Sequence, residues 1–108
     1  MPKSQSVWFV YVVAATLAEA RLIAKSVVQA NLAACANILG GVESFYKWKG
    51  TLKTGKEVAV IFKTTRHKVT PLIGRVKKGH SYECPCIVAW KITKGLKPYL
   101  KWIDTQCS

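Results

Sequence analysis

Acidic residues are scarce in this chain of 108 residues: five Asp and Glu stand against 17 Lys and Arg, for a formal net charge of +12. So few carboxylates leave little material for acid–base catalysis. They also disfavour Ca²⁺ and Mg²⁺ sites, which need several oxygen ligands. Residues 51–108 carry 12 basic and 3 acidic side chains and so contribute +9 of the total. Such an excess attracts anions and favours solubility.

The sequence also lacks a long apolar run. Its longest uncharged stretch, residues 7–18, falls short of the roughly 20 residues that a bilayer helix needs. The residues before it hold a single basic residue, Lys3, and no clear small-residue cleavage site, which disfavours a secretory signal. The four cysteines lack framework-like spacing. We therefore expect a cytoplasmic protein with reduced thiols and no membrane partner.

Linkers, internal repeats and low-complexity tracts are absent as well. Half of the residues are hydrophobic, and a chain of this length can bury roughly two thirds of the surface that it exposes when unfolded. Residues 1–108 are therefore expected to form a single domain with one compact core.

Hydrophobic periodicity predicts alternating strands and helices. Val7–Ala15 is a continuous β-branched and aromatic run, typical of a central strand covered on both faces. Thr16 and Glu19 have capping-box spacing, in which the Glu19 carboxylate reaches back to the backbone of the cap residue. A helix should begin there, carry one apolar stripe and end near Asn31.

A long hairpin is expected next. Residues 34–49 alternate with a period of two, and Gly40 and Gly41 within them predict a bulge. A turn over residues 50–55 should lead into a partner strand, Glu57–Thr65. This hairpin could project beyond the body of the domain.

The remaining elements are shorter. Residues 69–76 form an amphipathic pattern whose Pro71 belongs in the first helical turn, because proline cannot donate a helical hydrogen bond. Either Thr70 caps this helix or an irregular turn begins near Arg66. Cys84–Thr93 then predicts a strand, and residues 98–103 predict a short terminal helix.

The resulting order, βαββαβ with an added C-terminal helix, indicates an α+β ferredoxin-like sandwich. Its antiparallel sheet should carry the two main helices on one side. The opposite face of the sheet would expose aromatic and aliphatic side chains, which is unusual for a monomer. Either a partner subunit or a ligand should cover it, and self-association is the simpler of the two.

Cys84-Pro85-Cys86 is the sharpest chemical feature. On a strand, two residues separated by one point to the same face, so both sulfurs could bind one soft ion, with His80 just upstream. Two thiolates and an imidazole would suit copper(I) or zinc. The alternative is that these cysteines are small apolar residues of a core strand.

Nucleic-acid binding is disfavoured. RNA-recognition motifs share the βαββαβ order, but their aromatic signature has no match in residues 53–62, KTGKEVAVIF. We therefore expect no nucleic-acid partner.

Several blocks of the sequence resemble the CutA divalent-cation tolerance family over about residues 6–104. These blocks, in order, are Leu32–Ile38, Ser44–Gly50, Glu57–Thr65, His80–Pro85 and Tyr99–Ile103. The resemblance implies a ferredoxin-like subunit in a homotrimer whose long hairpins wrap neighbouring subunits. It also implies a non-enzymatic role in the response to metal ions, with copper binding in some members.

The metal site carries over only in part. The cysteine that some members have at the end of the first strand corresponds to Val12, and their paired histidines correspond to Gly79 and His80. A metal site for copper or another soft ion would therefore use His80, Cys84 and Cys86. The rival hypothesis is a signalling or scaffolding trimer that binds a small anionic ligand or a protein partner at clefts between subunits. The candidate cleft residues are Tyr46, Trp48, Lys63, Arg66, Tyr82 and Trp102. A third interpretation is a purely structural trimer.

Overall fold

A computed structural model describes residues 6–108 of the chain. The stretch containing Lys3, expected to carry no secretory signal, lies outside the described residues. The elements are β1 (Val7–Ala14), α1 (Leu17–Gln29), β2 (Cys35–Trp48), β3 (Thr51–Thr65), α2 (Arg66–Gly79), β4 (Ile87–Lys91) and α3 (Lys97–Gln106). Among residues 6–108, no helix has the length and apolarity that a membrane crossing requires.

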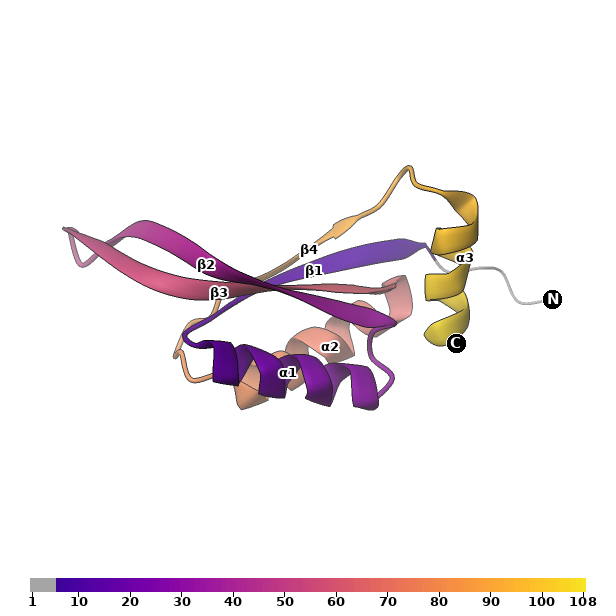
Figure 1. Cartoon of the computed structure of the whole chain (residues 1–108), viewed down its shortest axis with the longest axis horizontal. Helices are drawn as coiled ribbons and strands as arrows, with labels where there is room; N and C mark the ends of the chain where they lie inside the picture. Colours follow the sequence, from indigo (N-terminus) through magenta and orange to yellow (C-terminus); the bar gives the residue numbers. More distant parts are fainter. Residues whose placement is uncertain (1–5) are drawn as a thin grey trace.

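The four strands form one antiparallel sheet in the order β2-β3-β1-β4. Both α1 and α2 lie against one face of this sheet, and α3 lies at the end away from the hairpin tip (Figure 1). The α+β ferredoxin-like prediction, with its added C-terminal helix, is therefore confirmed.

The core lies between the sheet and its two helices. Val10, Val12 and Phe62 on the strands are fully buried and pack in one cluster with Val27 of α1 and Leu72 of α2. The other sheet face is more open, because Val88 and Trp90 on β4 and Leu39 on β2 are exposed. One-sided burial of a sheet is expected when a single helical layer covers it.

The hairpin of β2 and β3 extends beyond the rest of the sheet. Strand β3 pairs with β1 only over its residues 58–65. Its pairing with β2 continues along the hairpin as far as Thr51. The projection accounts for the 53 Å length of the molecule (Figure 1). Gly40 and Gly41 form the predicted bulge, and the positive φ of 70° at Gly41 favours glycine there.

The predicted turn over residues 50–55 is wrong. Lys49 and Gly50 form a two-residue turn with φ of 50° and 77°, and Trp48 pairs directly with Thr51. Such turns match the right-handed twist of the flanking strands. Apart from Leu52, residues 51–56 are polar or glycine and this part of the hairpin is mostly exposed, so its composition resembles that of a loop.

The second helix also begins earlier than Thr70. Helix α2 starts at Arg66, directly after β3, and its first backbone N–H donates to the Ser6 carbonyl over 2.9 Å. Pro71 therefore lies inside the helix and not in its first turn, and it removes one helical hydrogen bond. Burial of Leu72 and Val76 on the apolar face offsets this loss.

Strand β4 begins at Ile87 and ends at Lys91, so the predicted strand Cys84–Thr93 is too long. The Cys86 carbonyl still accepts from the Val13 N–H over 3.2 Å. The Val13 carbonyl, however, accepts from the His80 ring, and Pro85 has no N–H to donate. Both cysteines thus precede the strand, and the same-face argument does not apply to them.

Helix α1 has the predicted start and end. The Thr16 hydroxyl accepts from the Glu19 backbone N–H over 3.1 Å. At the other end, the N–H groups of Asn31 and Leu32 donate to the carbonyls of Val28 and Val27. With Asn31 at a φ of 60°, this is a Schellman motif.

We expect Asn31→Ala to lower the free energy of unfolding by about 1 kcal/mol, because alanine lacks the short polar side chain that makes this left-handed φ tolerable for asparagine. Asn31→Gly, the matched control, should leave stability unchanged or raise it. Urea unfolding with equal denaturant slopes measures the difference. An equal loss in both variants would attribute the effect to the loss of the amide side chain and not to the left-handed φ.

Candidate functional site

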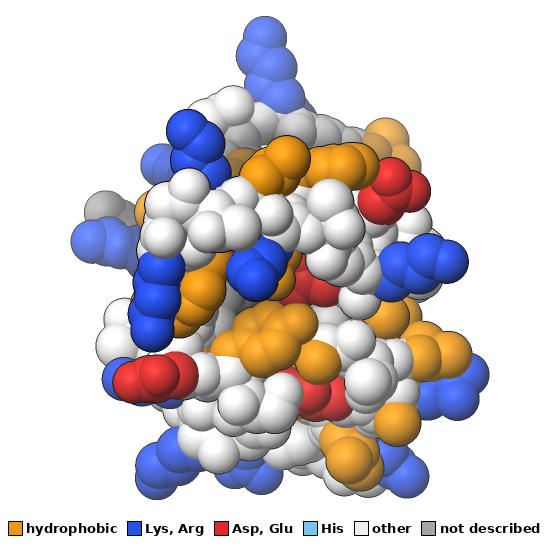
Figure 2. Space-filling model, turned by 90° about the vertical axis from the view of Figure 1, so that its left-hand side faces the viewer, with side chains coloured by type: hydrophobic (Ala, Val, Ile, Leu, Met, Phe, Trp, Pro, Cys, Tyr) orange, Lys and Arg blue, Asp and Glu red, His pale blue; other side chains and the backbone are white. Residues whose placement is uncertain are grey.

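An open cleft separates the hairpin from the segment between α2 and β4. Its volume is about 1020 Å³. Figure 2 views the molecule from the hairpin end and shows apolar side chains near the middle of this face, with acidic side chains beside them and Lys and Arg mostly at the outline. The lining residues are Val13, Ser44, Phe45, Tyr46, Trp48, Lys53, Glu57, Ser81, Tyr82, Glu83, Cys84 and Cys86.

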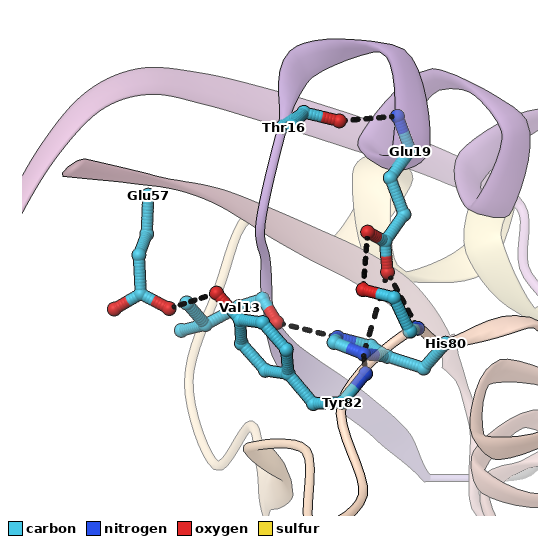
Figure 3. A network of polar contacts seen from close by, with 7 residues as sticks. Val13, Thr16, Glu19, Glu57, His80 and Tyr82 are labelled. Atoms are coloured by element: carbon cyan, nitrogen blue, oxygen red, sulfur yellow. Dashed lines mark hydrogen bonds and ion pairs between the residues drawn. The ribbon is translucent and has the colours of Figure 1, made fainter. Parts of the chain in front are cut away.

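His80 attaches one wall of this cleft to the sheet. Its side chain is 0% exposed, and its Nε2 lies 2.6 Å from the Val13 carbonyl oxygen (Figure 3). Its Nδ1 lies 3.0 Å from the Tyr82 backbone nitrogen. Because a carbonyl can only accept, Nε2–H donates to Val13, and Nδ1 also lies 3.3 Å from a Glu19 carboxylate oxygen. Both ring nitrogens are therefore engaged by backbone groups.

Glu19 joins the same segment to α1. One carboxylate oxygen accepts from the Ser81 backbone N–H over 3.0 Å, and the other accepts from the Ser81 hydroxyl over 2.8 Å. Burial acts to raise the pKa of Glu19, but these two hydrogen bonds and the nearby His80 ring outweigh it, so the pKa lies below its usual value of 4.5. The carboxylate thus holds the cleft wall instead of closing the predicted capping box.

Tyr82 crosses the cleft to the hairpin. Its hydroxyl donates to a Glu57 carboxylate oxygen over 2.8 Å (Figure 3). Burial, followed by this hydrogen bond and the charge of Glu57, raises the pKa of Tyr82 to about 12. The ring also lies 4.8 Å from the His80 ring. The segment after α2 is therefore connected to β1, α1 and β3 by polar contacts.

The three predicted metal ligands do not form one site. Within residues 6–108, no three His, Cys, Asp or Glu side chains come together in a way that could hold a metal ion. The His80 nitrogens have backbone partners, while Cys84 and Cys86 are exposed free thiols in the cleft. Partial burial and the charge of Glu57 raise the pKa of the Cys86 thiol, which disfavours the thiolate that a metal requires. A site of imidazole and two thiolates does not fit this geometry.

The predicted cleft residues separate into different places. Tyr46, Trp48 and Tyr82 line the cleft. Lys63 lies outside it and donates to the Tyr99 hydroxyl over 3.1 Å, with Trp102 stacked on Tyr99. Arg66 is exposed at the first position of α2. Within one subunit, the aromatic residues of the hairpin and the two cations therefore do not share a pocket.

Two carboxylates of the site could not be identified from local patterns. The sequence predicts a helix-capping role for Glu19, whereas its contact with Ser81 spans 62 residues of sequence. Glu57 was treated only as the first residue of a strand, although it accepts from Tyr82 25 residues away. The available signal is the scarcity of acidic residues, because a chain with only five carboxylates offers few acceptors of charge-assisted hydrogen bonds.

Comparisons with known proteins agree on one family. Residues 8–106 match the family described as CutA1 divalent ion tolerance protein. A divalent-cation tolerance protein CutA from Archaeoglobus fulgidus is 44% identical over 96 residues, covering 89% of this chain and 93% of the relative.

Solved structures of this family share the fold. CutA from Xylella fastidiosa has a TM-score of 0.92 at 33% identity, covering 95% of this chain and 99% of that one. A structure from Archaeoglobus fulgidus, described as a periplasmic divalent cation tolerance protein CutA, has a TM-score of 0.90 at 41% identity. It covers 94% of this chain and 99% of that one.

Glu19→Gln should lower the free energy of unfolding at pH 7 by about 1.5–3 kcal/mol, the range for hydrogen bonds to a charged group. A depressed carboxyl pKa stabilises the folded state above about pH 4.5, and this contribution disappears as the pH falls through the lower pKa of the folded state. Urea unfolding at pH 7 and pH 3 should therefore show a difference between variant and wild type that shrinks in acid.

The exposed Glu43 provides a matched control for this charge removal. We expect Glu43→Gln to change stability little at either pH. A pH-independent effect of Glu19→Gln, or an equal effect of both variants, would contradict a structural role for the Glu19 charge.

Proposed function

Because the chain belongs to the CutA1 divalent ion tolerance family, we propose that it acts in the response to metal ions as a homotrimer without catalytic activity. The observation that carries this proposal is the family match over residues 8–106. These residues include all the helices and strands of the described part of the chain except Val7, the first residue of β1. The trimer, the metal and the compartment each rest on separate features of the structure.

Unpartnered apolar surface supports self-association. The projecting hairpin exposes Phe45, Trp48 and Leu52, with Trp48 55% exposed. The open sheet face adds Val88 and Trp90. Large exposed apolar areas on a small protein are typical of interaction surfaces. A cyclic assembly in which each hairpin lies on a neighbour would cover both regions with one repeated contact.

The cleft supports a weak soft-metal site formed by thiols alone. Cys84 and Cys86 are both exposed and both line the cleft, together with Glu57 and Glu83. Sulfur ligands favour copper(I) over harder cations. We propose that copper or another soft ion binds there as a transient ligand, and that His80 has a structural role.

Absence of catalysis is part of the same proposal. The His80 side chain is 0% exposed and does not line the cleft, so it lies out of hydrogen-bond reach of a molecule bound there. The Tyr82 hydroxyl, with its pKa of about 12, is a poor acid at neutral pH.

For localisation we propose the cytoplasm, as a compartment that keeps thiols reduced. All four cysteines are unpaired, and two of them are exposed. Reducing compartments preserve such thiols. Recovery of the protein outside the cytoplasm on cell fractionation would contradict this part of the proposal.

The assembly should have a mass three times the 12.0 kDa of one chain in native mass spectrometry. Trp48→Ser should raise the apparent dissociation constant about tenfold or more, because a tryptophan at the centre of an interface commonly contributes about 2 kcal/mol. Leu22→Ser, which alters a residue of α1 that is 72% exposed, is the control and should leave the mass unchanged. A monomer for the unmodified chain would contradict the trimer.

Copper(I) titration of the reduced, metal-free protein against a competing chelator tests the thiol site. We expect uptake that is lost in the Cys84→Ser, Cys86→Ser double variant and kept in Cys35→Ser. Because the Cys86 pKa is raised, protons compete with the metal, so affinity should increase as the pH rises from 6 to 8. Uptake that the double variant retains would exclude this site and favour the alternative of a trimer that binds anions or partners.

A further inference from the structure

The helical layer carries positive charge that the proposed metal response does not use. Helices α1 and α2 together contain seven Lys and Arg and one acidic residue, Glu19. That carboxylate is bonded to Ser81. Lys77 and Lys78 lie in the last turn of α2, where they complement the helix dipole. The cations nearer the middle of the layer have no such role.

A shallow groove lies between α1 and α2 and has a volume of about 360 Å³. None of its lining residues is acidic, and two are cationic. The lining residues are Leu22, Lys25, Ser26, Gln29, Ala30 and Arg75. The groove lies on the helical layer, whereas the aromatic cleft is lined mainly by the hairpin and the segment after α2. The two are therefore separate sites.

Arg75 is fixed across this groove. Its Nε–H donates to the Ser26 hydroxyl over 2.9 Å, which links α2 to α1. This contact uses one of the five N–H groups of the guanidinium. A guanidinium held at Nε keeps its terminal nitrogens in a fork that matches two oxygens of a phosphate. Holding the side chain in place also reduces the entropy lost when a ligand binds.

The negative end of the α1 dipole lies beside the groove and opposes an anion there. Three of the carbonyls at this end accept backbone N–H groups: Ser26 from Ala30, Val27 from Leu32 and Val28 from Asn31. These bonds reduce the exposed negative charge. Two full positive charges, from Lys25 and Arg75, exceed the remaining partial charge of about one half.

We propose that this groove binds an anion carrying a phosphate group, with Lys25 and Arg75 as its charged contacts and the Gln29 amide as a further donor. A dianion would balance the two cations, and the space exceeds what a single phosphate requires. This proposal does not depend on the metal response, because it uses neither the thiols nor the hairpin.

Inorganic pyrophosphate is a suitable probe. Isothermal titration at about 0.15 M salt should show saturable binding to the wild-type protein, weakened about tenfold or more in Lys25→Gln, Arg75→Gln, since two charge-assisted contacts are lost. The matched control is Lys77→Gln, Lys78→Gln, which removes the same charge from the same layer outside the groove. It should weaken binding about threefold or less, through the general field alone. Circular dichroism melts establish that each variant is folded.

Binding to lipid vesicles distinguishes a phosphate of a soluble ligand from a phosphate of a lipid headgroup. Pyrophosphate binding without binding to vesicles of 30% phosphatidylserine and 70% phosphatidylcholine would support a soluble ligand, and binding to both would support a lipid headgroup in the same groove. Vesicle binding alone would overturn the groove as a site and assign the charge to a membrane surface. Absence of saturable pyrophosphate binding, or equal weakening in both double variants, would also overturn the proposal.

Discussion

A buried imidazole determines how the chain between α2 and β4 lies against the sheet. The His80 ring donates a hydrogen bond to the Val13 carbonyl near the end of β1 and accepts one from the Tyr82 backbone N–H. The first contact prevents β4 from extending toward its N-terminus, and the second fixes the course of the following residues. From this position Ser81 reaches Glu19 and Tyr82 reaches Glu57. The cleft wall, and with it the exposure of both cysteines, therefore depends on one fully buried ring.

The single helical layer imposes a second constraint. It buries the Val10, Val12 and Phe62 face of the sheet and leaves the opposite face to other partners. On that face, Phe9 and Trp90 meet edge to face with their ring centroids 6.0 Å apart, and Lys63 lies 5.5 Å from the Phe9 ring centroid. Aromatic and cation contacts of this kind keep a partly open surface ordered without closing it. The single helical layer thus both forms the core and leaves a sheet face on which a partner could pack.

Short sequence patterns predict those structural features that depend only on residues close together in the chain. The Thr16 cap, the Asn31 stop and the Gly40 and Gly41 bulge all involve contacts within a few positions, so they could be identified from spacing. The start of β4 could not, because it depends on His80 contacting a carbonyl 67 residues earlier.

The candidate site shows the same limit. Of the six residues predicted for a ligand or interface cleft, Tyr46, Trp48 and Tyr82 line one cleft of the subunit, whereas Lys63, Arg66 and Trp102 lie outside it. The predicted metal site requires Cys84 and Cys86 to lie on one continuous strand, but β4 begins only at Ile87. Contacts between distant segments, such as Tyr82 with Glu57, carry no signature in a single sequence.

The two-residue turn at Lys49 and Gly50 has a consequence for the order of folding. It joins two strands that follow one another in the sequence and pair outward from Trp48 and Thr51, and such hairpins form in about 1–10 μs. Pairing of β1 with β4 must bring together residues about 75–83 positions apart, which is slower because a long loop has to close. The hairpin should therefore exist, with Phe45 and Trp48 uncovered, before the body is complete. During that interval the net charge of +12 keeps newly made chains apart by mutual repulsion.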